Sequence, residues 1–139
     1  YERAMARAGL ECLHINSPDF SVASGMEAAK SLLAAPHNRP TGIFCASDEL
    51  AIGTILASRS LGLRVPEDLS VIGIDGHELG EVFGLTTVSQ DPKGQGAAAV
   101  EAVLSLLAKK PLEADWIQRF YPTGFVVRSS TSVPSELRR

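Results

Sequence analysis

Short apolar segments alternate with longer segments of helical periodicity along most of this chain, and this alternation limits its fold more than any other feature. Three of the apolar segments are residues 42–46 (GIFCA), 70–75 (SVIGID) and 85–90 (LTTVSQ), each too short for an ordinary helix. Their isoleucine, valine and threonine residues favour strands. Strands separated by helices form parallel sheets that helices cover on both faces. The sequence therefore predicts an α/β fold, with a parallel sheet and helices on both faces.

The predicted long helices begin and end at recognisable residues. Ser21 is expected to cap one helix, Ser47 or Asp48 a second that Gly62 ends, and Asp91 a third over residues 91–110. The third has a proline at its first helical position, which that position accepts. Its apolar residues recur at helical spacing: Ala97, Val100, Leu104 and Leu107.

The remaining segments are shorter. We expect a helix over residues 2–7 that ends at Gly9, a strand over 10–15 (LECLHI), a loop with a helical turn over 77–84, and extended chain over 116–122 and 124–130.

Length and charge indicate a single domain that does not bind nucleic acid by itself. The chain has 139 residues, 45% of them hydrophobic, which suits one domain with a substantial core. Its formal net charge is −3. Because non-specific binding to nucleic acid requires clustered lysine and arginine, we expect this chain alone to bind DNA poorly.

The cellular setting follows from the apolar segments and the cysteines. No segment approaches the roughly 18 apolar residues of a membrane span, and none resembles a secretory signal. We therefore expect a cytoplasmic protein without membrane association. Cys12 and Cys45 lie in apolar surroundings and are interpreted as two buried thiols, although their number also allows a pair. Tyr1 lies inside a helical pattern, so we expect the chain to be part of a longer protein.

Five residues follow predicted strands at their carboxyl ends, where open α/β sheets bind ligands. They supply carboxylates, a hydroxyl, an amide and an aromatic ring: Asp75, Asp48, Ser47, Gln90 and Phe20. A ring covers an apolar ligand face, and a carboxylate accepts hydrogen bonds from paired hydroxyl groups. The sequence predicts that these five residues bind a polyhydroxylated or heterocyclic small molecule.

Each of these residues also has a structural interpretation. Asp75 suits a turn, Asp48 suits a helix cap, and Gln90 with Asp91 suits the cap of the long helix. Phe20 suits a hydrophobic staple against the first turn of the following helix. The sequence alone leaves both interpretations open.

Signals for catalysis and metal binding are weak. Residues 94–99 (GQGAAA) match a dinucleotide-binding pattern, but Asp91 already begins a helix, so the glycines fall inside its first turns. His14, His37 and His77 are scattered and have no ligand-like neighbours in the sequence. No nucleophile-and-base set is recognisable. We expect no catalytic site, no metal and no cofactor.

Four phrases resemble the lactose-repressor family of bacterial transcription regulators (LacI/GalR type). They are PTGIFCASDELAIG, LGLRVPEDLSVIGIDG, LTTVSQD and GFVVRSST, in that order along nearly the whole chain. The second phrase, with its turn feeding a strand that ends in aspartate, is the most specific.

The resemblance implies a periplasmic-binding-protein-like fold (type I, with Rossmann-like lobes), in which two α/β lobes close on an effector and pair into homodimers. An N-terminal headpiece, which this chain lacks, binds operator DNA. Residues 1–89 and 112–139 then correspond to the C-terminal lobe, and residues 90–111 to a helix that crosses to the N-terminal lobe.

Carried over by position, Asp75 matches the ligand-binding aspartate of the family and Phe20 its stacking aromatic residue. Ser47 stands where many members have a polar contact residue, commonly asparagine, just before Asp48, and Gln90 lies at the crossing. Three departures follow: serine at 47 shortens a polar arm, Gly84 replaces a common proline, and Gly76 replaces a frequent second acid. The effector therefore stays open between a sugar and another small polar molecule.

The sequence thus predicts the effector-sensing and dimerisation part of a LacI-type transcription regulator that is not an enzyme. A solute-binding protein of a transporter, with the same fold, is the first alternative, and an α/β enzyme is the second. In the family's topology the helix over residues 92–109 has no lobe to cover within this chain. We expect it to pack on a second copy, on its own lobe, or on polypeptide beyond this sequence, because exposing its apolar residues is costly.

Overall fold

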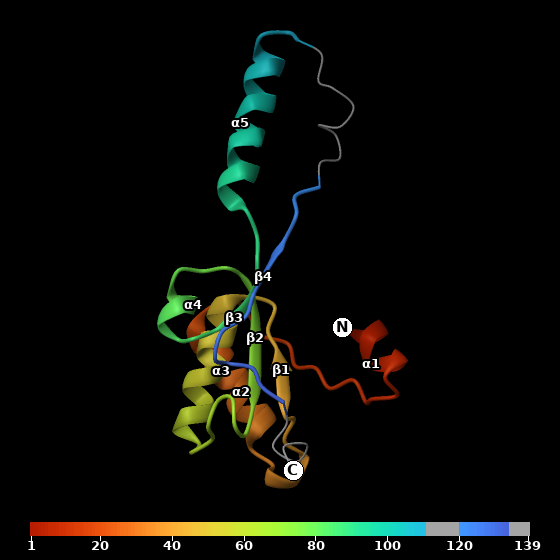
Figure 1. The fold of residues 1–139 in the computed structure, drawn as a ribbon, viewed down its shortest axis with the longest axis vertical. Helices are drawn as coiled ribbons and strands as arrows, with labels where there is room; N and C mark the ends of the chain where they lie inside the picture. The colour runs from red at the N-terminus through yellow and green to blue at the C-terminus, as the bar shows by residue number, and fades with distance from the viewer. Residues whose placement is uncertain (111–119, 134–139) are drawn as a thin grey trace.

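The computed structural model describes residues 1–110 and 120–133 (Figure 1). Its helices are α1 (Glu2–Arg7), α2 (Val22–Leu33), the 3-10 turn η1 (Pro36–Asn38), α3 (Asp48–Ser60), α4 (Leu79–Val82) and α5 (Pro92–Leu107). Its strands are β1 (Gly42–Phe44), β2 (Ser70–Asp75), β3 (Thr86–Ser89) and β4 (Gly124–Val126). The expected helices all form, and the turn expected within residues 77–84 is α4.

The four strands form one sheet in the order β1-β2-β3-β4. β1 pairs with β2 and β2 with β3 in parallel, with Ile72 of β2 opposite both Phe44 and Thr86. This arrangement confirms the α/β class and the parallel sheet for the first three strands. β4 differs, because it pairs with β3 in the antiparallel direction and makes the sheet mixed.

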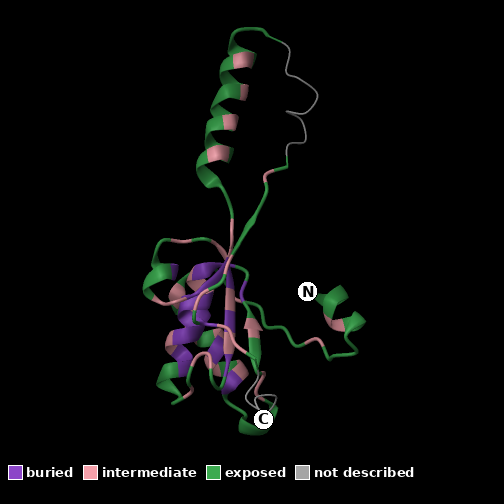
Figure 2. Ribbon diagram, viewed as in Figure 1, coloured by how far each residue is buried: buried purple, intermediate pink, exposed green. Residues whose placement is uncertain are grey.

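The core lies between the sheet and the pair of helices α2 and α3, which pack closely on each other (Figure 2). Two glycines make the close approach possible. A Cβ atom added at Gly25 would lie 2.6 Å from the carbonyl oxygen of Leu50, and one added at Gly53 would overlap the carbonyl oxygen of Val22. Since α3 begins directly after β1, this packing also brings the start of α2 to the carboxyl end of the sheet.

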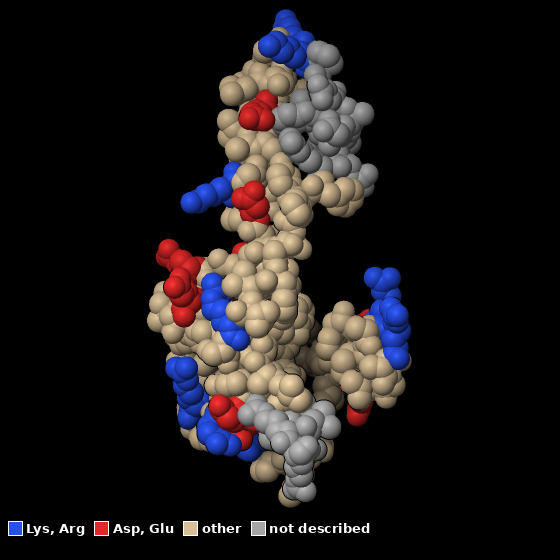
Figure 3. All heavy atoms as spheres, in the orientation of Figure 1, with Lys and Arg blue, Asp and Glu red and all other residues tan. Residues whose placement is uncertain are grey.

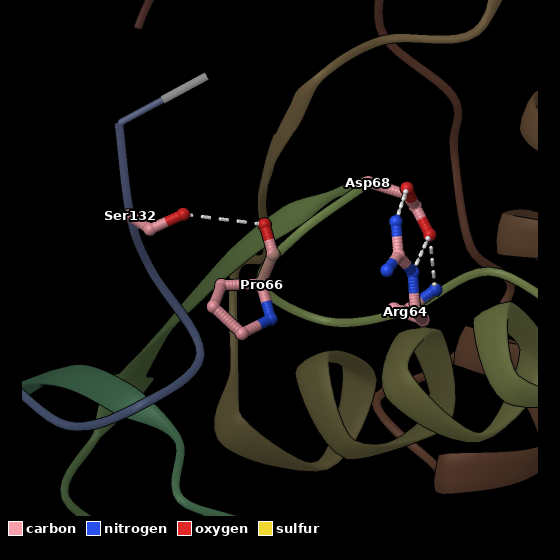
Figure 4. A network of polar contacts seen from close by, with 4 residues as sticks. All are labelled: Arg64, Pro66, Asp68 and Ser132. Atoms are coloured by element: carbon pink, nitrogen blue, oxygen red, sulfur yellow. Dashed lines mark hydrogen bonds and ion pairs between the residues drawn. The ribbon is translucent and has the colours of Figure 1, made fainter. Parts of the chain in front are cut away.

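The turn between α3 and β2 is fastened by side chains (Figure 4). Asp68 accepts hydrogen bonds from the backbone and the guanidinium group of Arg64, each at 2.8 Å. The hydroxyl of Ser132 donates to the carbonyl oxygen of Pro66 at 3.3 Å, so the segment after β4 also contacts this turn. These contacts fix the entry into β2, the strand that ends in Asp75.

The strand predicted over residues 10–15 is wrong, because the structure has no regular element there. A strand needs a hydrogen-bonded neighbour, and no strand of the described residues pairs with this segment; β1 pairs only with β2. A cavity of about 450 Å³ lies between residues 13–20 and the surfaces of β1 and α2.

The two cysteines match the predicted buried thiols only in part. Cys45 is buried and Cys12 is half-buried, and both are free thiols.

Helix α5 stands away from the sheet (Figure 1). It has no buried residue, and Val100, Leu104 and Leu107 are all exposed. The structure therefore does not show packing on its own lobe, one of the three arrangements expected for this helix, and its apolar stripe is solvent-exposed in the single chain. Most of the extended segment predicted over 116–122 lies outside the described residues.

Candidate functional site

Asp75 ends β2 and turns the chain out of the sheet. Its φ angle is 126°, a region that residues with a side chain rarely adopt. Its carboxylate accepts a hydrogen bond from the side-chain amide of Gln90 at 2.9 Å, and its carbonyl oxygen accepts the Gln90 backbone N–H at 3.1 Å. Gln90 is exposed and follows β3, so these contacts join the ends of two neighbouring strands.

The electrostatic setting of Asp75 favours its neutral form more than water does. Desolvation by burial raises the pKa of its carboxyl group, and the negative charges of Asp48 and Glu49 raise it further. Hydrogen bonds from the Asp48 backbone and the Gln90 side chain act in the opposite direction. The pKa of Asp75 is raised overall, so its charged form is less stable than in water. Hydrogen-bond donors of a ligand would stabilise that charged form.

Ser47 and Asp48 lie beside Asp75, but both are buried. The Ser47 hydroxyl accepts the Leu50 backbone N–H at 3.2 Å and so caps α3. The side chain of Asp48 is fully buried, and its two oxygens accept from the Thr87 hydroxyl and the His77 backbone N–H, both at 2.7 Å. The structure therefore gives these two residues internal partners rather than open surface.

Phe20 lies two residues before α2, at the same end of the sheet, and is 63% exposed. It lines the cavity beside β1 together with Phe44, Ala46 and Leu50. Asp75 and Gln90 do not line that cavity. The structure thus places Phe20 and Asp75 at the carboxyl end of the sheet without bringing them into one pocket.

The open groups of the site can bind and orient, but they do not form a catalytic set. Asp75 and Gln90 offer a carboxylate and an amide to hydroxyl or N–H groups of a small molecule. Within residues 1–110 and 120–133 no three histidine, cysteine or acidic side chains are placed to hold a metal ion. Gly94 and Gly96 lie inside α5, which Asp91 caps by accepting the Gly94 N–H at 2.9 Å. The glycine pattern is therefore part of a helix and not of a phosphate loop.

Sequence reasoning missed Thr87 and Gly73. The Thr87 hydroxyl, fully buried, donates to Asp48 and accepts the Gly76 N–H at 3.3 Å. A Cβ atom at Gly73 would overlap the Asp48 carboxylate, so glycine is required beneath it. The only available signals were a threonine inside an apolar strand and a glycine inside β2, and neither identifies its partner.

The charged side chains are spread over the surface. In Figure 3 the lysine and arginine side chains are scattered over the lobe, α1 and both ends of α5, and form no continuous patch on that face. Among the described residues, no helix combines the length and apolar character needed to cross a membrane.

A family model described as a periplasmic binding protein-like domain matches residues 1–131. Similar proteins include the HTH-type transcriptional repressor PurR of Erwinia tasmaniensis, 39% identical over 118 residues, and the ribose operon repressor of Halalkalibacterium halodurans, 36% identical over 117 residues. These matches cover 84% and 83% of this chain, and 34% of each relative. The chain thus spans about a third of the length of these relatives.

Solved structures agree in fold. The lac repressor dimer bound to operator and the anti-inducer ONPF has a TM-score of 0.82 at 27% identity, covering 95% of this chain and 46% of that one. A LacI family transcriptional regulator from Arthrobacter sp. FB24, in complex with lactose, has a TM-score of 0.80 at 31% identity, covering 94% and 48%.

Proposed function

Because this chain belongs to the lactose-repressor (LacI/GalR) family and carries its periplasmic-binding-protein-like domain, we propose that it is the C-terminal part of the effector-binding domain of a transcription repressor. The similar proteins are repressors rather than enzymes or transport proteins, which favours this function over both alternatives. In the proposed whole protein, further N-terminal polypeptide binds operator DNA and two chains form a dimer.

The proposal rests on one observation: Asp75 accepts hydrogen bonds from Gln90 through both its carboxylate and its backbone carbonyl oxygen. Gln90 is the first residue of the connection from β3 to α5, and the returning chain enters β4 beside it (Figure 1). A ligand group bound by the Asp75 carboxylate either displaces the hydrogen bond from the Gln90 amide or contacts both side chains. Ligand binding therefore acts at the point where the sheet joins α5.

This position suits control by population shift. A ligand that prefers one orientation of α5 relative to the sheet increases the share of molecules in that orientation. In a repressor, that share sets the geometry of the two DNA-binding regions of the dimer. No covalent step is needed for such a shift.

We infer a small polar effector of the sugar type. A carboxylate paired with an amide accepts and donates hydrogen bonds to vicinal hydroxyl groups, and each bond to a charged group contributes about 1.5–3 kcal/mol net. Phe20 supplies an exposed ring at the same end of the sheet for an apolar ligand face. The lactose complex of the Arthrobacter relative and the sucrose complex of a Lactobacillus casei relative, the latter 26% identical, support this ligand class.

We also propose that residues 90–111 belong to a second lobe, formed with polypeptide outside this sequence. The exposed apolar side chains of α5 support this assignment: Val100, Val103, Leu104, Leu106 and Leu107. Residues 1–89 and 112–139 then make up the C-terminal lobe, and the effector binds between the two.

The test is a thermal-shift screen of the full-length protein with lactose, sucrose, ribose and purine bases, because a bound ligand raises the unfolding temperature by mass action. With a ligand that binds, Asp75→Ala is expected to weaken affinity at least about tenfold, the loss of one charged hydrogen bond. The unfolding temperature without ligand should change little, since Asp75 is not in the core. Equal losses of binding and stability would identify Asp75 as a structural acid and contradict the proposal.

Phe20→Ala provides a second measurement on the same ligand. An exposed ring contributes little to folding, so this variant should retain its unfolding temperature and lose affinity. Unchanged affinity would remove Phe20 from the site and leave Asp75 and Gln90 as its proposed contacts.

A further inference from the structure

Asp48 is a fully buried carboxylate at the first position of α3. Neither of the ion pairs found in residues 1–110 and 120–133, Lys30–Glu27 and Arg64–Asp68, involves it. A buried carboxylate outside an ion pair is costly, so it persists where hydrogen bonds hold it in one place. Here the Thr87 hydroxyl and the His77 backbone N–H donate to its two oxygens, each at 2.7 Å.

These bonds reach three separate parts of the lobe. Asp48 belongs to α3, Thr87 to β3, and His77 to the loop that follows β2. The Thr87 hydroxyl also accepts the Gly76 N–H at 3.3 Å, so the first two backbone N–H groups after Asp75 are both held by this network. Gly73 leaves the space beneath the carboxylate, because any side chain there would overlap it.

The loop held in this way is the one that sets the backbone of Asp75. With a φ angle of 126°, Asp75 is in a conformation that surrounding structure must maintain. The carboxylate of Asp48 fixes the chain immediately after it, while the sheet pairing of Asp75 with Ser89 fixes the chain before it. Release of the first constraint allows the loop and the Asp75 side chain to relax.

We propose that Asp48 is a positioning residue of the effector site: its buried carboxylate holds the Gly76–His77 backbone so that Asp75 keeps its strained conformation and its place beside Gln90. This inference rests on the proposed function of Asp75 as an effector contact. It replaces direct ligand binding by Asp48, because a fully buried side chain with both oxygens occupied has no free face. A helix-capping role does not account for Asp48, since Ser47 performs that role for α3.

The first test is amide hydrogen exchange of the full-length protein without ligand. In Asp48→Ala the peptide that contains Gly76 and His77 should exchange about tenfold faster, the loss of one charged hydrogen bond. Asp48→Asn should retain most of the protection, because an amide oxygen still accepts from one of the two donors, the His77 N–H. Asp68→Asn is the matched control, an aspartate that also accepts a backbone N–H in a turn remote from Asp75.

Two outcomes overturn the proposal. One is an exchange rate of the 76–77 peptide within twofold of the original protein in Asp48→Ala; the other is an equal increase across α2, α3 and this loop, which would make Asp48 a general core residue. If Asp48→Ala does not fold, Thr87→Val replaces it, since it removes the hydroxyl that contacts both Asp48 and Gly76.

A titration of Asp75 by carbon-13 NMR tests whether Asp48 lies close enough to act on the Asp75 carboxyl group. In Asp48→Asn the pKa of Asp75 should fall, because a neighbouring negative charge that raises it is removed, while that of Glu49 nearby remains. An unchanged Asp75 pKa would show that Asp48 does not act on it. Full effector response in Asp75→Ala would instead refute the proposed function, and the exchange result would still report on Asp48.

Discussion

Helices α3 and α5 are built by the same local rules and end in opposite surroundings. Each follows a parallel strand of the sheet, and each has a side-chain cap that accepts a backbone N–H three residues later: Ser47 from Leu50, and Asp91 from Gly94. Yet α3 buries eight of its thirteen residues, whereas α5, with sixteen, buries none (Figure 2). Local sequence therefore determines that a helix forms, and contacts from elsewhere determine whether it is covered.

The glycines of the two helices show where the difference arises. Gly53 of α3 faces the backbone of α2 so closely that a methyl group would overlap the Val22 carbonyl oxygen. A Cβ atom added at Gly96 of α5 would have no neighbour within 4 Å outside its own helix. In α3 the small residue serves close packing, whereas in α5 it serves no contact within the described chain. α5 is thus a helix whose apolar surface has no partner among the described residues.

The largest effect is expected from removing core side chains. Ile55 of α3 is fully buried, so Ile55→Ala should cost about 2–5 kcal/mol of unfolding free energy. Leu104 of α5 is 60% exposed in this chain, and a substitution at an exposed site changes the unfolding free energy by only about 0.5 kcal/mol. If a second lobe covers α5, Leu104→Ala in the full-length protein should cost several times that amount. Urea unfolding of both variants gives the comparison.

A small loss in Leu104→Ala of the full-length protein would contradict the assignment of α5 to a second lobe. Lys93→Ala, on the exposed first turn of α5, is a control in which no large change is expected in either case.

A second comparison exchanges the glycines for alanine. Gly53→Ala should destabilise the protein by about 1–3 kcal/mol, because the backbone of α2 must move to admit the methyl group. Where no second lobe covers this face of α5, Gly96→Ala should stabilise the protein by about 0.5–1 kcal/mol, because alanine is the better helix former and meets no neighbour. The midpoints of urea unfolding provide the measurement. A loss of stability at Gly96 would show that a partner approaches this face of α5 in the full-length protein.

The same contrast explains what the sequence could predict. Helix periodicity, caps and the β-branched strands predicted α2, α3, α5 and the parallel strands, because those signals are local. The pairing of β4 with β3 and the failure of residues 10–15 to form a strand depend on neighbours that are distant in the sequence. The antiparallel edge and the open side of β1 were therefore not predicted.

The candidate site divides in a similar way. Asp75 and Gln90 could be placed together, because they end neighbouring strands of one sheet. The burial of Asp48 could not be predicted, since it depends on Thr87 and on the loop at His77, 39 and 29 residues away. Whether Asp75 and Phe20 share a ligand also depends on the arrangement of α2, which no local pattern determines.

The smallest expected effect concerns the ion pair in the turn after α3. The turn after α3 is held by Asp68 and Arg64, and hydrogen bonds from Arg64 lower the pKa of Asp68 to about 2, from 3.8 for an isolated group (Figure 4). A lowered pKa in the folded state stabilises folding above the unfolded value and loses that contribution as the pH falls through the folded value. Asp68→Asn should therefore lower the unfolding midpoint at pH 6, and the difference from the original protein should vanish as the pH falls from about 4 to about 2.

Asp19, whose pKa is also lowered to about 2, titrates equally in both proteins, so its contribution cancels in the difference. The difference is small because the pair is exposed to solvent, where ion pairs contribute little. A difference that persisted at pH 2 would mean that Asp68 supports the turn through its shape and not through its charge.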